Sequence, residues 1–248
     1  DVLRALVAEL GEMGARSIAV GDRSGMGQTQ VVMQQIGVFD LAKELGFSTV
    51  VYDNLGEKDW ALQESKDLHW SRGFAVPKQL LDAEAVVQTC NLKTHRFGGH
   101  FTLSLKNSVG FVAKQIDGVG YNYMTELHGS QYQRHMIAEV NQVYKPALVV
   151  MDAVEAFADQ GPDQGRVVQP GVVLAALDRI ALDAVGVAIL RMHNTTPQVS
   201  QGRIFDLDQI ARAVELELGV RRPEDIHIVT QGAEGEAFAQ EVTRLLIQ

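Results

Sequence analysis

The sequence contains a single cysteine, Cys90, among its 248 residues. One thiol cannot form a disulfide within the chain, a cysteine-rich zinc site or an iron–sulfur cluster. We therefore expect no iron–sulfur cluster within this chain, and the sequence identifies no other cofactor. A reducing, cytoplasmic setting fits the single cysteine best, although an exported protein with few cysteines would have the same composition.

The sequence also lacks long hydrophobic runs and an excess of positive charge. It has no run of 18 apolar residues, so we expect no membrane span. Lys and Arg total 22 against 31 Asp and Glu, which gives a net charge of −9. This balance argues against general nucleic-acid binding, which needs a basic surface to contact phosphates. A local basic pocket within an acidic protein is still compatible with it.

The length and the 46% hydrophobic content suit one large globular domain. We expect a single α/β domain over residues 1–248, with a small excursion at 54–82 that holds Trp60 and Trp70. Apolar periodicity and turn residues predict strands that alternate with helices. Strands are expected at 17–20, 49–52, 83–89, 147–151, 172–176 and 226–229, and helices at 1–14, 29–44 with a break at Gly37, 102–112, 128–143, 179–192, 207–218 and 238–247. This alternation is typical of an open, mostly parallel sheet with helices on both faces.

The densest group of polar residues follows the strand predicted at 83–89. Because side chains of an extended chain alternate, Asn91, Lys93 and His95 share one face. Lys106 and Asn107 lie off the apolar stripe of the next helix. Ligands of open α/β sheets bind beyond the carboxyl ends of the strands, so these five residues indicate a site for a small carboxylate or phosphate. In the alternative interpretation, the lysines are solvated surface charges and His95 is a turn histidine.

Two carboxylates could join this site. Asp183 falls on the apolar stripe of the helix at 179–192, where a carboxylate must be paired or hydrogen bonded. It is therefore either a structural anchor or a site residue. Asp152 follows the apolar strand at 147–151, so it is either a site carboxylate at a strand end or an ordinary turn aspartate. The turn-rich residues 161–165 could shape a loop over the same face.

Three other features carry less weight. The glycine-rich residues 21–27 follow a strand but match neither nucleotide-binding loop pattern, so a plain strand-to-helix turn fits them better. His95 and His100 could form a divalent-metal site with Asp152 or Asp183, but their spacing matches no specific ligand set, and we assign no metal. Cys90 suits a core position better than a nucleophile.

Three segments together resemble a known family. Residues 91–112 (NLKTHRFGGHFTLSLKNSVGFV), 151–165 (MDAVEAFADQGPDQG) and 177–190 (LDRIALDAVGVAIL) are similar to domain of unknown function family 362. The resemblance implies an α/β fold and places Lys93, His95, Lys106, Asn107, Asp152 and Asp183 in the family pattern. It implies no established activity. Many relatives are labelled iron–sulfur proteins because they carry a cysteine-rich ferredoxin-like segment, from which this sequence departs.

Three functional hypotheses follow. In the first, the chain is an enzyme or binding domain for a small anionic molecule: Lys93 and Lys106 hold the negative group, Asn91 and Asn107 orient it, and His95 transfers a proton with Asp152 or Asp183 as its partner. The second is a metal-dependent site of histidines and aspartates. The third is a non-catalytic partner domain of a redox assembly. Homo-oligomerisation is compatible with each of them.

Overall fold

The computed structural model describes residues 1–64 and 66–248. Contacts between Cα atoms divide the chain into two compact units. Unit 1 comprises Asp1–Glu64, Gly73–Asp82 and Gly110–Met124, and unit 2 comprises Ser65–Arg72, Ala83–Val109 and Thr125–Gln248. No sheet is shared between the two units in the described residues. A single domain over the whole chain stays a prediction.

Unit 1 is built around a two-stranded parallel sheet and a two-stranded antiparallel sheet. Its elements are α1 (Val2–Glu12), β1 (Ala19–Asp22), α2 (Thr29–Gln35), α3 (Val38–Leu45), β2 (Ser48–Val51), the 3₁₀ turns η1 (Tyr52–Asn54) and η2 (Glu57–Asp59), β3 (Trp60–Gln63), β4 (Phe74–Pro77) and α4 (Lys78–Asp82). Strands β1 and β2 are parallel, and β3 and β4 are antiparallel. The predicted break at Gly37 is confirmed: its φ of 79° is left-handed and separates α2 from α3.

Unit 2 contains the largest sheet of the described chain, with the order β6-β5-β7-β8 and β9 paired to β7. Its elements are β5 (Val87–His95), β6 (His100–Thr102), α5 (Ser104–Asn107), α7 (Gln133–Glu139), η4 (Val140–Val143), β7 (Leu148–Phe157), β8 (Val167–Val168), β9 (Val172–Ala176), α8 (Arg179–Met192), α9 (Pro197–Ser200), η5 (Ile204–Asp206), α10 (Asp208–Glu215), η6 (Pro223–Asp225) and α11 (Gly232–Leu246). Two further elements, η3 (Ser108–Phe111) and α6 (Tyr123–Gly129), include residues of both units.

The prediction of one open, mostly parallel sheet is wrong, although the α/β class is confirmed. In unit 2 only β5 and β7 are parallel, while β6, β8 and β9 pair antiparallel with their neighbours. The strands of unit 1 form separate small sheets. The short segments between β5 and β6 and after β7 turn the chain straight back, which produces antiparallel pairs where helical crossovers were expected.

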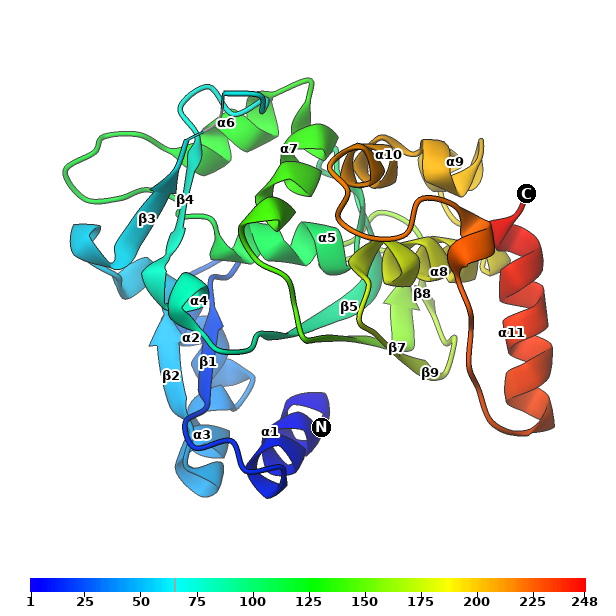
Figure 1. Cartoon of the computed structure of the whole chain (residues 1–248), viewed down its shortest axis with the longest axis horizontal. Coiled ribbons are helices and arrows are strands. Elements are labelled where there is room, and N and C mark those ends of the chain that lie inside the picture. The colour runs from blue at the N-terminus through cyan, green and yellow to red at the C-terminus, as the bar shows by residue number, and fades with distance from the viewer. Residues whose placement is uncertain (65) are drawn as a thin grey trace. The chain divides into compact units, whose positions relative to one another are not determined.

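The core of unit 2 lies between this sheet and α8 (Figure 1). Cys90, Leu92 and Met151 point from the strands into the core, where they meet apolar residues of α8. On the other face of β5, Thr89 and Asn91 are exposed. Helix α8 begins and ends where the sequence predicts, because Asp178 caps it by accepting the Ala181 N–H at 2.9 Å.

Candidate functional site

Strand β5 carries the predicted site residues within its length. It runs to His95 rather than ending at Thr89, so Asn91, Lys93 and His95 belong to the strand itself. Its inward-facing Leu92 is fully buried, whereas Asn91 is exposed and Lys93 is half-buried. The extended chain therefore brings Asn91, Lys93 and His95 to one face as the alternation predicts.

The turn after His95 is held from two sides. Arg96 donates its backbone N–H to Gly161 O at 3.3 Å and its Nη1 to the same oxygen at 2.8 Å, and it pairs with Asp163. From α7, Gln133 Nε2 donates to Phe97 O at 3.0 Å. The loop at 161–165 thus lies over this end of β5, in line with the interpretation of its turn residues. These contacts fix the direction in which the chain leaves His95.

Lys106 reaches His95 past Gly99. A Cβ on Gly99 would lie 2.7 Å from Lys106 Cε and 3.5 Å from His95 Nδ1. The stem of the lysine and the imidazole are therefore neighbours, and only a glycine leaves room for both beside the turn. Lys106 is 9% exposed although it carries a charge. Lys106 and His95 are thus both buried and lie side by side.

His95 is held in its neutral form. Burial, followed by the positive charges of Lys106, His128, Lys93 and Arg96, lowers the pKa of His95 to about 3. Its Nδ1 is buried and has no hydrogen-bond partner among the described residues. A neutral imidazole with an unpartnered nitrogen and cationic neighbours can accept a proton when a negative charge arrives.

Lys93 lies in a partly buried position on the same face. Burial lowers its pKa, while the negative charge of Asp163 acts in the opposite direction. His128 on α6 and Arg96 complete the positive surroundings of His95. Sequence reasoning assigned no role to His128, because no spacing pattern connects α6 to the end of β5.

Asp183 anchors α5, the helix that carries Lys106. Its carboxylate accepts the Ser104 N–H at 2.8 Å, the Ser104 hydroxyl at 2.5 Å and the Leu105 N–H at 3.1 Å. Burial raises the pKa of Asp183 to about 7 against these hydrogen bonds, which favour the carboxylate. No hydrogen bond links Asp183 to His95 in the described structure.

Asp152 and the two asparagines lie further along the sheet. Strand β7 continues to Phe157, so the prediction that Asp152 follows the strand end is wrong. Asp152 is paired in register with Asn91, and its Oδ1 accepts the Val154 N–H at 3.0 Å. Asn107 Nδ2 donates to Thr89 O at 3.0 Å, which ties α5 to β5.

Metal ligands do not converge in the described part of the chain. No three His, Cys, Asp or Glu side chains of residues 1–64 and 66–248 are arranged to hold a metal ion. Cys90 is buried in the core, and burial raises the pKa of its thiol well above the usual value. The geometry thus gives the metal hypothesis no ligand set among these residues.

The side chains of Asp22 and Ser24 form hydrogen bonds within the glycine-rich loop of unit 1. Asp22 Oδ1 accepts the Arg23 N–H at 2.8 Å, and Ser24 Oγ donates to Met26 O at 2.5 Å. Thr29, the first residue of α2, accepts the Ser24 N–H at 2.9 Å. These bonds are those of a strand-to-helix turn.

No described helix combines the length and the apolar character that crossing a bilayer requires. A thylakoid-associated protein of Synechocystis sp. is 24% identical to this chain over 192 residues, which cover 77% of the chain and 57% of that protein. The chain thus corresponds to little more than half the length of this relative. No solved structure matches the chain significantly. The family described as Domain of unknown function (DUF362) matches residues 1–188, and the chain therefore belongs to this family.

Proposed function

We propose that unit 2 binds a small molecule with a carboxylate or phosphate group at the end of β5, and that His95 takes up a proton in this site. The observation that carries the proposal is the buried, unpartnered Nδ1 of a neutral His95 among positive charges. The positive side chains of Lys106 and Lys93 act on a poorly solvated imidazole, and such a place favours an anion.

The two lysines proposed to contact the anion come from different elements. Lys106 comes from α5 and passes Gly99, while Lys93 comes from the strand. The two ammonium groups can therefore contact different oxygen atoms of one anion. Asn91 lies two residues before Lys93 on the same strand face and offers an amide donor.

Two residues act through others. Asp183 holds the first turn of α5, and Asn107 ties the same helix to β5, so both position Lys106. Asp152 lies in register with Asn91 at the polar end of the site. The anion would raise the pKa of His95, because a negative charge stabilises the imidazolium. His95 could then serve as a general base toward the bound molecule.

Sulfate tests the proposal because its charge is constant above about pH 3, and titration calorimetry at fixed ionic strength gives its affinity. Lys93→Met and Lys106→Met should each weaken sulfate binding about tenfold or more, as expected for the loss of a charge-assisted contact of ~1.4 kcal/mol. Lys145→Met removes an exposed lysine of the same unit and should leave the affinity unchanged. An equal effect of all three substitutions, or no saturable binding to the unmodified chain, would contradict the proposal.

A further inference from the structure

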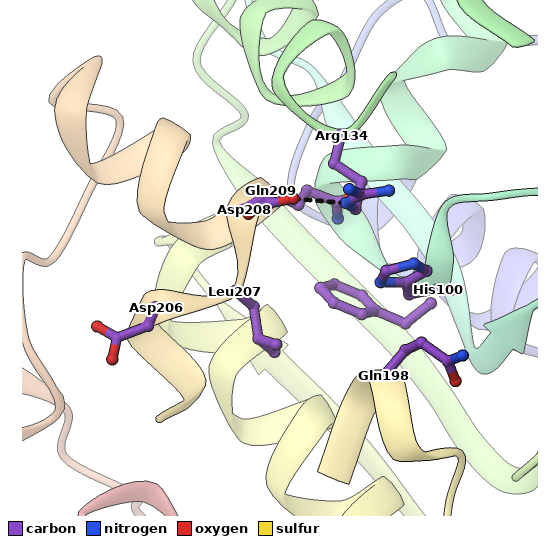
Figure 2. Close-up of a pocket in the computed structure, with 8 residues that line it drawn as sticks. His100, Arg134, Gln198, Asp206, Leu207, Asp208 and Gln209 are labelled. Carbon is purple, nitrogen blue, oxygen red and sulfur yellow. Dashed lines mark hydrogen bonds and ion pairs between the residues drawn. The ribbon is translucent and has the colours of Figure 1, made fainter. Parts of the chain in front are cut away.

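A cavity of unit 2 lies at the other end of the turn that follows His95. It has a volume of about 200 Å³ and is lined by β6, α7, α9 and the start of α10. Figure 2 shows His100 and the paired Arg134 and Asp208 at its wall, with Leu207 on the opposite side. None of the residues proposed to contact the anion lines this cavity.

Gln209 lines the cavity, and its side-chain amide has no hydrogen-bond partner in the described structure. Its side chain has no exposed surface, and neither Nε2 nor Oε1 has a hydrogen-bond partner in the described structure. A buried polar group without a partner costs about 1–3 kcal/mol. A glutamine here is explained if another molecule supplies both a donor and an acceptor.

The arginine of the cavity is already paired. Arg134 Nε donates to Asp208 Oδ2 at 2.8 Å, and its Nη1 donates to Gly98 O at 3.1 Å. Burial, followed by the charge of Arg134, lowers the pKa of His100, which favours a neutral imidazole. Asp206 also borders the cavity, and in Figure 2 its carboxylate points away from the other side chains. The cavity therefore lacks the group of positive side chains that lowers the pKa of His95.

We propose that this cavity binds a small neutral molecule with a carboxamide, lactam or urea group. Gln209 Nε2 would donate to the carbonyl oxygen of that group, and Oε1 would accept its N–H. Phe101 and Leu207 provide apolar surface for the rest of the molecule. A carboxylate fits this cavity less well, because it would leave Oε1 without a donor and because Arg134 is already paired with Asp208.

Gln209 has no exposed surface in the free protein, so a ligand contacts its amide only when a lining side chain moves aside. The exposed Gln198 of α9 is one of the lining side chains. A ligand that reached Gln209 would satisfy a group that is buried without a partner in the free protein. The binding free energy would therefore depend on the Gln209 amide more than on the surrounding apolar contacts.

Benzamide and benzoate test this inference, because they share a shape and differ in the group that Gln209 would recognise. By titration calorimetry on the full chain, benzamide should bind saturably and at least about tenfold more tightly than benzoate. Gln209→Met should abolish this preference without lowering the unfolding temperature, because methionine has a similar volume and no polar atoms to satisfy. Gln240→Met replaces an exposed glutamine of α11 and should retain it.

Three results would overturn the inference: equal affinity for the two probes, no saturable binding of benzamide, or a preference for benzamide that persists in Gln209→Met. The sulfate affinity of the same proteins separates this inference from the anion site. Gln209→Met should leave sulfate binding unchanged, because Gln209 lies outside the group of residues around His95.

Discussion

Asp183 on α8 holds Ser104 at the start of α5 through two hydrogen bonds, with its Oδ1 2.8 Å from Ser104 N and 2.5 Å from Ser104 Oγ. Asp183 is completely buried, and its Oδ2 accepts the Leu105 N–H as well. One carboxylate thus satisfies the first backbone donors of a four-residue helix that carries Lys106.

Replacing the Asp183 carboxylate should lower the stability of the fold. Asp183→Asn keeps one acceptor but places an amide N–H against a backbone N–H, so we expect a loss of about 2–4 kcal/mol in the free energy of unfolding. Denaturant titration measures the loss. Asp67→Asn alters an exposed carboxylate of the same unit and should change stability by less than about 0.5 kcal/mol. If Asp183→Asn lowers the free energy of unfolding no more than Asp67→Asn does, the hydrogen bonds of Asp183 to α5 do not stabilise the fold.

Gly99→Ala should weaken anion binding without removing a charge. The added methyl group would lie 2.7 Å from Lys106 Cε, so the lysine stem must leave its present position beside His95. We expect sulfate affinity to fall several-fold while the helical signal in circular dichroism is retained. Gly11→Ala is the matched control, because no atom lies within 4 Å of the Cβ that it adds. Unchanged affinity in Gly99→Ala would mean that the position of Lys106 does not matter.

Acid should destabilise the protein partly through His95. The folded pKa is lowered to about 3 from an ordinary value of 6.5, so the unfolded chain binds the proton more tightly between these pH values. The contribution of neutral His95 to stability is therefore complete above pH 6.5 and is lost as the pH falls toward 3. Relative to His95→Gln, the wild-type free energy of unfolding should fall by up to about 1.4 kcal/mol per pH unit below pH 6.

The comparison with His95→Gln isolates this effect from Asp183, whose raised pKa acts in the opposite direction. His227→Gln replaces an exposed histidine and should follow the wild-type pH dependence. Parallel pH profiles for wild type and His95→Gln would contradict a buried neutral histidine.

The sequence predicts the elements best where local signals agree. Helix α8 has a capping Asp178 and a continuous apolar stripe, and β9 is a short apolar run, so both have the predicted bounds. Strand β5 extends six residues past its predicted end at Thr89, because Asn91 and Lys93 point away from the core while Leu92 and Thr94 point inward. A strand with polar residues on one face and buried residues on the other is therefore easily mistaken for a loop.

The strand predicted at 226–229 is wrong for a related reason. Ile226 and Ile228 pack against the core while His227 and Val229 are exposed, which produces the alternation of a strand without a neighbouring strand to pair with. Partner choice is a tertiary property, as is the charge around His95. His128 reaches this region from α6, and no local pattern could assign it there. The turn residues at 161–165 indicate a loop over this face but not the effect of Asp163 on Lys93.

The pKa of His95 in the absence and presence of sulfate tests the central claim most directly. Imidazole signals in NMR spectra of the full chain, assigned by their loss in His95→Gln, report its protonation between pH 8 and pH 4.5. We predict that His95 stays neutral at pH 5 in sulfate-free buffer and that saturating sulfate raises its pKa. Titration near 6.5 without sulfate, or a pKa that sulfate does not change, would contradict this prediction.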